Sequence, residues 1–318
     1  MSYKILHGDC IEQMRTLPDQ CVNTCVTSPP YFGLRDYGHD GQIGLEATPD
    51  AFVAKMVDVF REVRRVLRDD GTLWLNLGDS YTANGSGGNT ATRQGLAGGK
   101  LEKPTAQGFG KIVRTIPNGL KPKDLIGIPW RVAFALQADG WYLRQDIIWH
   151  KPNPMPESVT DRCTKAHEYI FLLSKSARYY YDADAVKEDA SESTNQRDSY
   201  KRTGYQKENR DGFVNHLDPN SGEYRDCKGQ RNKRSVWTVT TKPYKGAHFA
   251  TFPPDLIRPC ILAGCQIGGT VLDPFGGSGT TAQVAIEEGR EAILCELNAD
   301  YIKLAHERLN GTRIKMLW

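Results

Sequence analysis

The glycine-rich loop in the last quarter of the chain is the feature that most constrains the fold. An apolar run ends in Asp273, the loop GGSG opens a helix-like stretch, and a second apolar run ends in Glu296. This strand–loop–helix–strand order is typical of parallel sheets that bind nucleotide-like ligands at the carboxyl ends of their strands. The segment therefore predicts a ligand site formed by Asp273, the loop and Glu296.

The composition of the loop favours a ligand without phosphate groups. The sequence DPFGGSGTT has neither the GxGxxG spacing of dinucleotide sites nor the GxxxxGK[ST] pattern of phosphate-binding loops, and it contains no Lys or Arg. Glycines let the backbone approach a ligand closely, and the carboxylate of Glu296 can accept two ribose hydroxyls. S-adenosylmethionine (AdoMet) meets these conditions. A loop that only joins a strand to a helix is the structural alternative.

The rest of the chain alternates between helix-like and strand-like segments. Apolar residues recur at helical spacing from Phe52 to Leu67, and Asp69-Asp70-Gly71 is expected to end that helix before a strand over 72–77. Asp124 is expected to cap a second helix whose apolar face runs from Leu125 to Leu136.

Further strands are expected over 21–26, 141–150, 168–174, 268–275 and 291–297. Asn298 is expected to cap a final helix. Strands that alternate with helices in this way predict an α/β fold with a mostly parallel sheet and helices on both faces.

Composition indicates a soluble globular protein. The chain has 318 residues, of which 39% are hydrophobic and 25% charged, and no stretch approaches the ~18 apolar residues that span a bilayer. Its start, MSYKILHGDC, has no basic leader or apolar signal core, so we expect a cytoplasmic protein without a membrane partner. The eight cysteines form no CxxC pair, which favours packed, reduced thiols over a disulfide framework or a metal site.

Two long polar segments are rich in basic residues. Seven Lys or Arg stand against one acid over 81–123, and ten stand against six acids over 197–236. Such segments are either solvated loops or nucleic-acid surfaces on which basic side chains contact phosphates. The candidate DNA-contacting residues are Lys100, Lys103, Lys111, Lys201, Arg202, Arg231, Lys233 and Arg234.

A second short motif, TSPPY, stands at the end of the apolar run 21–26. Neither proline can donate to a sheet, so a plain turn is one interpretation of Pro29 and Pro30. Taken together with DPFGGSGTT, however, the motif resembles those of the AdoMet-dependent DNA amino-methyltransferases of the N6-adenine/N4-cytosine family. The order, with the tetrapeptide before the cofactor loop, resembles the beta group, and the resemblance covers nearly the whole chain.

This resemblance implies a Rossmann-like AdoMet-methyltransferase sheet with an inserted target-recognition region. The methyltransferase domain would comprise residues 1–186, including the basic loop 81–123, and residues 237–318. The insertion would be 187–236. The partners implied are double-stranded DNA and a second copy in a homodimer. The chain is either a free-standing methyltransferase or one half of a pair with a separate restriction endonuclease, and the sequence leaves both open.

The resemblance also implies roles for single residues. The catalytic residues would be Ser28, Pro29, Pro30 and Tyr31: Ser28 Oγ and the Pro29 carbonyl would accept the N–H bonds of the target amino group, and Tyr31 would stack on the flipped base. The cofactor-binding residues would be Asp9, Cys10, Thr251, Phe252, Pro253, Asp273, Phe275, Gly276, Gly277, Ser278, Gly279, Thr280 and Glu296.

The target base stays open at this point. Ser as the first residue of the tetrapeptide leans toward cytosine N4, but the longer SPPYFGLRDYG resembles a group that includes adenine methylators. An AdoMet-dependent amino-methyltransferase acting on RNA or protein is one alternative, and an inactive DNA-binding protein is another. Cytosine-C5 methylation would need a thiolate such as Cys260, which lies in the helix-like run DLIRPCILAGC.

Overall fold

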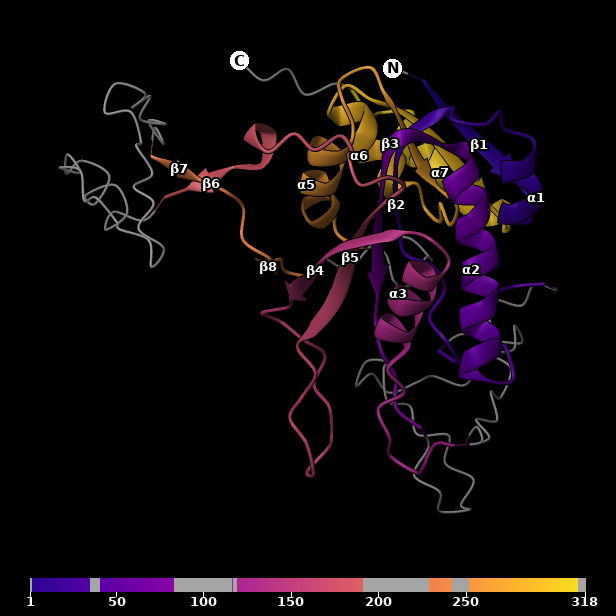
Figure 1. Cartoon of the computed structure of the whole chain (residues 1–318), viewed down its shortest axis with the longest axis vertical. Coiled ribbons are helices and arrows are strands. Elements are labelled where there is room, and N and C mark those ends of the chain that lie inside the picture. The colour runs from indigo at the N-terminus through magenta and orange to yellow at the C-terminus, as the bar shows by residue number, and fades with distance from the viewer. Residues whose placement is uncertain are drawn as a thin grey trace, which may run out of the picture. The chain divides into compact units, whose positions relative to one another are not determined.

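The computed structural model describes residues 2–34, 41–82, 116, 119–190, 229–241 and 252–313 (Figure 1). The chain forms two compact units. The first consists of Met1–Asp182 with Ser235–Trp318, and the second of Ala183–Arg234.

The first unit is built on an eight-stranded sheet with the order β1-β10-β9-β2-β3-β5-β4-β8. The strands are β1 (Tyr3–His7), β2 (Val22–Thr27), β3 (Leu67–Leu77), β4 (Tyr142–His150), β5 (His167–Ser174), β8 (Val236–Thr238), β9 (Thr270–Asp273) and β10 (Glu291–Glu296). Among these described strands only β5 runs antiparallel to its neighbours. The predicted α/β fold with a mostly parallel sheet is confirmed.

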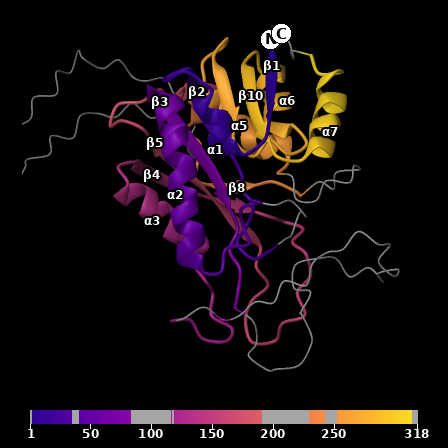
Figure 2. The same ribbon diagram turned by 90° about the vertical axis from the view of Figure 1, so that its right-hand side faces the viewer.

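Helices cover both faces of this sheet, as Figures 1 and 2 show. The helices are α1 (Cys10–Arg15), α2 (Pro49–Val66), α3 (Ile128–Ala138), α5 (Pro254–Gly264), α6 (Thr280–Glu287) and α7 (Ala299–Leu309). One face carries α1, α2 and α3, and the other carries α5, α6 and α7. None of the described helices has an apolar stretch of the length that crossing a membrane requires.

Burial of an apolar stripe fixes α2 on the sheet. Phe52, Met56, Val59 and Val63 are all completely buried, and they belong to one core with the side chains of β2 and β3. Each such side chain contributes about 1.5–3 kcal/mol when it leaves water. The hydroxyl of Thr48 caps the helix by accepting the Ala51 N–H at 3.1 Å. This packing holds β2 and β3, whose ends carry the candidate site.

The end of α2 differs from the prediction. α2 ends at Val66 and β3 begins at Leu67, so Asp69-Asp70-Gly71 lies inside the strand instead of forming a turn. The carbonyls of Asp70 and Gly71 accept backbone hydrogen bonds from Tyr180 and Lys175. Because these partners lie more than a hundred residues away, local turn propensity could not indicate the strand.

The start of α3 differs as well. The N-cap position is Gly127, at φ 78°, and Asp79 Oδ1 accepts the N–H groups of Gly127 at 3.0 Å and Ile128 at 3.1 Å. Asp124, the expected cap, accepts the Lys121 N–H instead, and Leu125 is half exposed. The capping carboxylate therefore comes from a distant loop and not from the residues just before the helix.

The cysteines depart from the prediction at one position. Cys10, Cys25, Cys260, Cys265 and Cys295 are buried, and Cys21 is partly buried. Cys163 is exposed in the connection between β4 and β5. Most of the described thiols are therefore packed, but this one is not.

The candidate site residues gather at one edge of the sheet. Ser28 follows β2, Asp273 ends β9 and Glu296 ends β10, and these strands lie in one parallel set, so their carboxyl ends share an edge. β4 ends just before Lys151, and the antiparallel β5 begins at the same edge next to Glu168.

Candidate active site

The tetrapeptide Ser28-Pro29-Pro30-Tyr31 follows directly on β2. The last strand residue, Thr27, is buried, and its hydroxyl donates to Asp273 Oδ1 at 2.6 Å. Ser28 is partly exposed, and within the described part of the chain its Oγ has no hydrogen-bond partner. Ser28 therefore offers an unused acceptor at the carboxyl end of β2.

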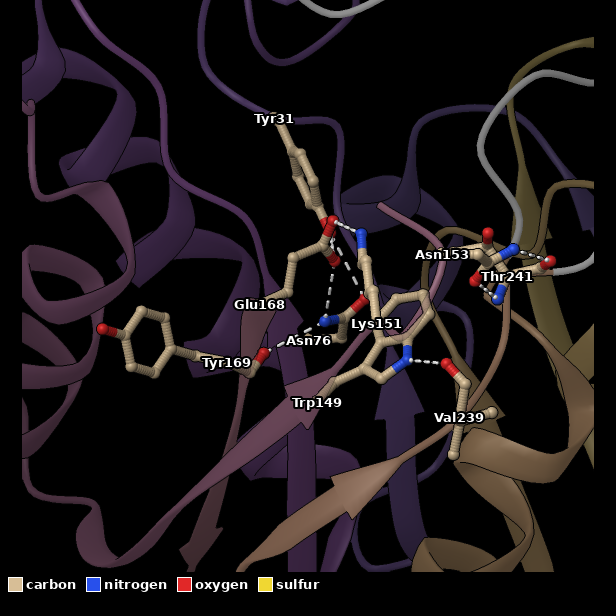
Figure 3. Close-up of polar contacts among 9 residues, drawn as sticks. All are labelled: Tyr31, Asn76, Trp149, Lys151, Asn153, Glu168, Tyr169, Val239 and Thr241. Carbon is tan, nitrogen blue, oxygen red and sulfur yellow. Dashed lines mark hydrogen bonds and ion pairs between the residues drawn. The ribbon is translucent and has the colours of Figure 1, made fainter. Parts of the chain in front are cut away.

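Tyr31 lies in a polar cluster that the sequence analysis missed. Its ring packs on Gly78, where a Cβ atom would come within 2.5 Å of Tyr31 Cε2. Its hydroxyl donates to Glu168 Oε2 at 2.7 Å, and Lys151 pairs with the other carboxylate oxygen of Glu168. Asn76 Nδ2 also donates to Glu168 Oε2, at 3.3 Å (Figure 3).

A sequence signal for these residues exists. Asn76 lies near the end of the expected strand 72–77, Lys151 follows the expected strand 141–150, and Glu168 begins the expected strand 168–174. Polar residues at strand ends are candidates for a site, but their convergence depends on β5 running antiparallel between β3 and β4. The spacing alone does not indicate that direction.

Backbone hydrogen bonds hold the glycine-rich loop against the end of β10. The Gly276 N–H donates to the Cys295 carbonyl at 2.8 Å, and the Gly277 N–H donates to Glu296 Oε2 at 2.7 Å. Gly279 starts α6 at φ 79°, and a Cβ atom there would also lie 3.1 Å from Ala305 Cβ. Glycine at 279 thus satisfies both a left-handed backbone and a close helix contact.

Asp273 is buried and fully engaged with the protein. It is 2% exposed, and it accepts hydrogen bonds from the hydroxyls of Thr27 and Thr281, each at 2.6 Å, and from the Phe275 N–H at 3.0 Å. Burial raises the pKa of its carboxyl, and the three hydrogen bonds oppose that rise. Asp273 therefore ties the cofactor loop to the strand that leads into Ser28.

Glu296 receives two backbone N–H groups, one on each carboxylate oxygen. Gly277 donates to Oε2, and Asn298 donates to Oε1 at 2.8 Å. Burial raises the pKa of Glu296, and these two amides oppose the rise. Each carboxylate oxygen has further lone pairs for ribose hydroxyls. Asn298 also caps α7, as predicted, by accepting the Asp300 N–H.

Two hydroxyls of the loop differ in their surroundings. Ser278 Oγ is buried with no hydrogen-bond partner among the described residues, so a polar group of a ligand could form the missing hydrogen bond. The hydroxyl of Thr280 already accepts a hydrogen bond from Arg308 of α7, a contact that the sequence analysis missed. Phe275 is partly exposed beside them.

Four of the remaining predicted cofactor residues lie in the described chain, and Thr251 does not. Asp9 caps α1 by accepting the Ile11 and Glu12 N–H groups on Oδ1. Cys10 is buried, and burial, with the nearby Asp9 carboxylate, raises its pKa to about 12. Pro253 is buried, Phe252 is partly exposed next to it, and Thr251 lies outside the described residues.

Cys260, the thiol that cytosine-C5 methylation would need as its nucleophile, is buried. Cys260 is 1% exposed within α5. A thiol buried in this way cannot reach a base, so a covalent thiolate mechanism has no support from this residue.

The described basic candidates belong to the second unit, with η1 (Asp184–Val186), β6 (Glu188–Asp189) and β7 (Gln230–Arg231). Arg231 and Arg234 both pair with Glu188 Oε1, at 3.0 and 2.7 Å. The Arg234 side chain is 67% exposed and that of Arg231 is 31% exposed. Lys233 is partly exposed between them. The other candidates lie outside the described residues: Lys100, Lys103, Lys111, Lys201 and Arg202.

Taken together, the fold and the arrangement at this edge define a Rossmann-like methyltransferase. Comparison with known families narrows the class: the sequence model of the DNA methylase family matches residues 22–307. The chain belongs to this N6/N4 DNA methylase family.

Two curated relatives align over nearly the whole chain. The type II methyltransferase M.SmaI of Serratia marcescens is 49% identical over 308 residues, which cover 97% of this chain and 91% of that protein. M.Cfr9I of Citrobacter freundii, also a type II methyltransferase, is 47% identical over 307 residues, which cover 96% and 87%. The chain is therefore a site-specific, AdoMet-dependent DNA methyltransferase. Neither relative supports the RNA or protein alternative.

Solved structures share the fold. The PvuII DNA methyltransferase, described as cytosine-N4-specific, aligns with a TM-score of 0.62 at 17% identity over 97% of this chain and 86% of that one. A DNA modification methylase of Thermus thermophilus, complexed with S-adenosyl-L-methionine, aligns with a TM-score of 0.57 at 21% identity over 98% and 94%. These likenesses confirm the Rossmann-like architecture.

The residues of the loop edge fit AdoMet. AdoMet has a ribose and an amino-acid end, and three features suit it. The buried Ser278 hydroxyl has no hydrogen-bond partner among the described residues, the loop glycines let the backbone approach a ligand, and the carboxylate of Glu296 has further lone pairs. No Lys or Arg stands in the loop to favour phosphate.

Proposed function

We propose that the chain methylates the N4 amino group of cytosine in a specific duplex DNA sequence, through the tetrapeptide Ser28-Pro29-Pro30-Tyr31. The observation that carries this proposal is Ser28 itself. Its Oγ is partly exposed at the carboxyl end of β2 and has no protein partner in the described chain.

Ser28 and Pro29 act on the target nitrogen. The lone pair of an exocyclic amino group is delocalised into the ring, so the nitrogen is a poor nucleophile. Ser28 Oγ and the Pro29 carbonyl accept its two N–H bonds, which draws the lone pair out of conjugation. The proline rings fix the carbonyl, since a misplacement of ~1 Å can cost about a hundredfold in rate.

Tyr31 and the cofactor loop position the two reactants. The ring of Tyr31 offers a face on which a base can stack after it leaves the duplex. Ser278, Glu296 and the loop glycines would hold AdoMet, which supplies an electrophilic sulfonium methyl group when it is bound. The Thr27–Asp273 hydrogen bond links β2, and so Ser28, directly to the cofactor loop.

Cytosine is favoured over adenine by two observations. Ser, not Asp, is the first residue of the tetrapeptide. In addition, one of the solved structures that share the fold is described as cytosine-N4-specific. Both amino groups offer similar N–H donors, so adenine N6 is the outcome that the experiment must distinguish.

Nucleoside analysis tests the choice of base. Plasmid DNA from a methylation-deficient host that expresses the chain is digested to nucleosides and analysed by mass spectrometry. N4-methylcytosine is expected. N6-methyladenine would correct the base, and 5-methylcytosine would contradict amino methylation altogether. Plasmid DNA from the same host without the chain serves as the blank, and sequencing of the methylated plasmid would identify the site.

The partners follow from the substrate. DNA is the substrate, and we propose residues 187–236 as the target-recognition insertion of a methyltransferase domain formed by 1–186 and 237–318. A homodimer, a companion restriction endonuclease and a cytoplasmic location stay predictions. Sedimentation of the full chain with and without duplex DNA tests the dimer.

A further inference from the structure

We infer that Glu168, held by Lys151, is a positioning residue that fixes the ring of Tyr31 in the orientation that receives the flipped base. The inference rests on the proposed stacking role of Tyr31. It extends the catalytic group beyond the tetrapeptide to residues that lie more than a hundred positions away in the sequence.

The carboxylate of Glu168 joins three segments of the sheet edge. Oε2 accepts the hydroxyl of Tyr31 at 2.7 Å and the amide of Asn76 at 3.3 Å, and Oε1 pairs with Lys151. Asn76 is held in turn because its Nδ2 also donates to the Tyr169 carbonyl at 3.0 Å. Figure 3 shows Tyr31 and Lys151 meeting at the carboxylate.

The ion pair is sheltered from water. The side chains of Lys151 and Glu168 are 18% and 16% exposed. A charge this far from water needs a partner, because an isolated one loses most of its hydration. Lys151 also lies 4.2 Å from the centroid of the Trp149 ring, and Trp149 Nε1 donates to the Val239 carbonyl at 2.8 Å. The Glu168 carboxylate is therefore fixed by the Lys151 ammonium group, which is itself held against the Trp149 ring.

The ring of Tyr31 has little freedom under these contacts. Its hydroxyl is bonded to a charged acceptor, a stronger hydrogen bond than one between neutral groups. Its edge lies against Gly78, where even a Cβ atom would collide with the ring. A side chain ordered before the base arrives costs less entropy when the base binds. Glu168 thus preorganises the stacking surface.

A double-mutant cycle tests this inference in the full chain. Tyr31→Phe removes the hydroxyl and keeps the ring, and Glu168→Gln removes the charge and keeps the shape. Each should lower the single-turnover methylation rate by about 10- to 100-fold, the value of a hydrogen bond to a charged group. The double variant should be no slower than the slower single variant, because Glu168→Gln weakens, through loss of charge, the same hydrogen bond that Tyr31→Phe deletes.

Two control variants remove similar groups elsewhere. Tyr179→Phe deletes a tyrosine hydroxyl that accepts a hydrogen bond from Arg144 at 3.2 Å. Glu157→Gln deletes the carboxylate that pairs with Arg162 at 2.5 Å and is similarly sheltered, with side chains 26% and 23% exposed. Neither should change the methylation rate by more than about twofold.

A base-flipping signal separates positioning from folding. AdoMet affinity, measured by calorimetry, should stay at the wild-type value in Glu168→Gln, which shows that the variant is folded. With a fluorescent base analogue at the mapped target position, the flipped population should fall in Tyr31→Phe and Glu168→Gln alike. The maximal rate should therefore fall more than the KM for DNA rises. If Glu168→Gln does not fold, Lys151→Met tests the same inference by removing the cation that holds Glu168. It should also reduce the flipped population.

The outcomes are distinct. Rate losses that add in the double variant would overturn the inference, and so would a wild-type rate in both Glu168→Gln and Lys151→Met. If Tyr31→Ala methylates at the wild-type rate, the proposed role of the tetrapeptide fails first. If Tyr31→Ala is slow while the Glu168 variants are normal, only the positioning role of Glu168 is wrong.

Discussion

The cofactor-binding residues (the cofactor side) and the residues that would receive the target base (the base side) share one edge of the sheet, the active edge. They are held in place in different ways. On the cofactor side, Asp273 is 2% exposed and bonded to two hydroxyls and a backbone amide, and Glu296 is bonded to two more amides. On the base side, Tyr31 and Asn76 both donate to one partly buried carboxylate, Glu168, which pairs with Lys151.

The two kinds of support differ in how easily one substitution removes them. On the cofactor side, backbone amides of Phe275, Gly277 and Asn298, which no side-chain substitution deletes, hold Asp273 and Glu296. The sheltered Lys151–Glu168 ion pair is more sensitive to substitution, because removal of either side chain leaves the other charge without a partner. The base side is therefore the place where single substitutions should change catalysis without changing cofactor binding.

The largest effect is expected from Ser28→Ala. Loss of the acceptor should slow single-turnover methylation by roughly 10²–10³-fold, by analogy with the removal of one preorganised hydrogen-bonding group from an active site. The affinities for AdoMet and DNA should change little, because in the described chain Ser28 has no protein partner whose loss would disturb the fold. Rapid-quench methylation and binding titrations give both values. A wild-type rate would mean that the tetrapeptide is only a turn.

Asp273→Ala tests the link between the two sides. The change leaves the hydroxyls of Thr27 and Thr281 and the Phe275 N–H without their acceptor in a buried place. Each buried donor left without its acceptor costs about 1–3 kcal/mol, so the free energy of unfolding should fall by at least about 3 kcal/mol. Thr27→Val should cost about one third of that and slow methylation, because it breaks only the bond to β2.

Chemical denaturation measures these changes. The control is Asp300→Ala: Asp300 is an exposed acid, and its side chain is 80% exposed. That substitution should alter the free energy of unfolding by no more than about 0.5 kcal/mol. Equal losses for Asp273→Ala and the control would show that the buried network does not stabilise the fold.

Glu296→Ala should weaken AdoMet binding by about 1–3 kcal/mol, the value of hydrogen bonds to a charged acceptor. DNA affinity without AdoMet should stay unchanged. Unaltered AdoMet affinity in titration calorimetry would remove Glu296 from the cofactor site.

The pH dependence of AdoMet binding sharpens this test. Burial raises the pKa of Glu296 above its ordinary value of 4.5. The wild-type affinity should therefore fall as the pH decreases through the raised pKa, whereas Glu296→Gln should show no such step. The stability effect has the opposite sign: the contribution of Glu296 is fully present below pH 4.5 and is lost as the pH rises through its raised pKa. Without AdoMet, Glu296→Gln should therefore gain stability relative to the wild type in that range.

The same comparison explains how much the sequence could predict. The cofactor side is contiguous: Asp273, the loop and Glu296 lie within one strand–loop–helix–strand segment. Local rules of glycine conformation and strand ends therefore predicted its position, and Asn298 was correctly predicted as the cap of α7. The motif at Ser28 was visible for the same reason.

The base side could not be predicted in this way. Glu168 and Lys151 meet Tyr31 only because β5 runs antiparallel between β3 and β4. Likewise, Asp79 caps α3 from 48 positions upstream of Gly127, although Asp124 was the nearer candidate. Contacts that depend on strand order have no local signature, so sequence reasoning found the motifs but missed the residues that support them.

The remaining predictions concern DNA affinity and site choice and involve neither the cofactor residues nor the tetrapeptide. Arg234 is the more exposed of the two arginines on Glu188, so Arg234→Ala should relax the choice of site by roughly 1–3 kcal/mol if its guanidinium contacts a guanine edge. Replacing Lys100, Lys103 and Lys111 by Ala should instead weaken binding to all duplexes alike. Each lost phosphate contact should reduce the slope of log affinity against log salt concentration by about 0.9. Competition with scrambled duplex at several salt concentrations separates the two effects. Loss of specificity in the lysine variant, with only a general loss of affinity in Arg234→Ala, would reverse the roles of the two basic segments.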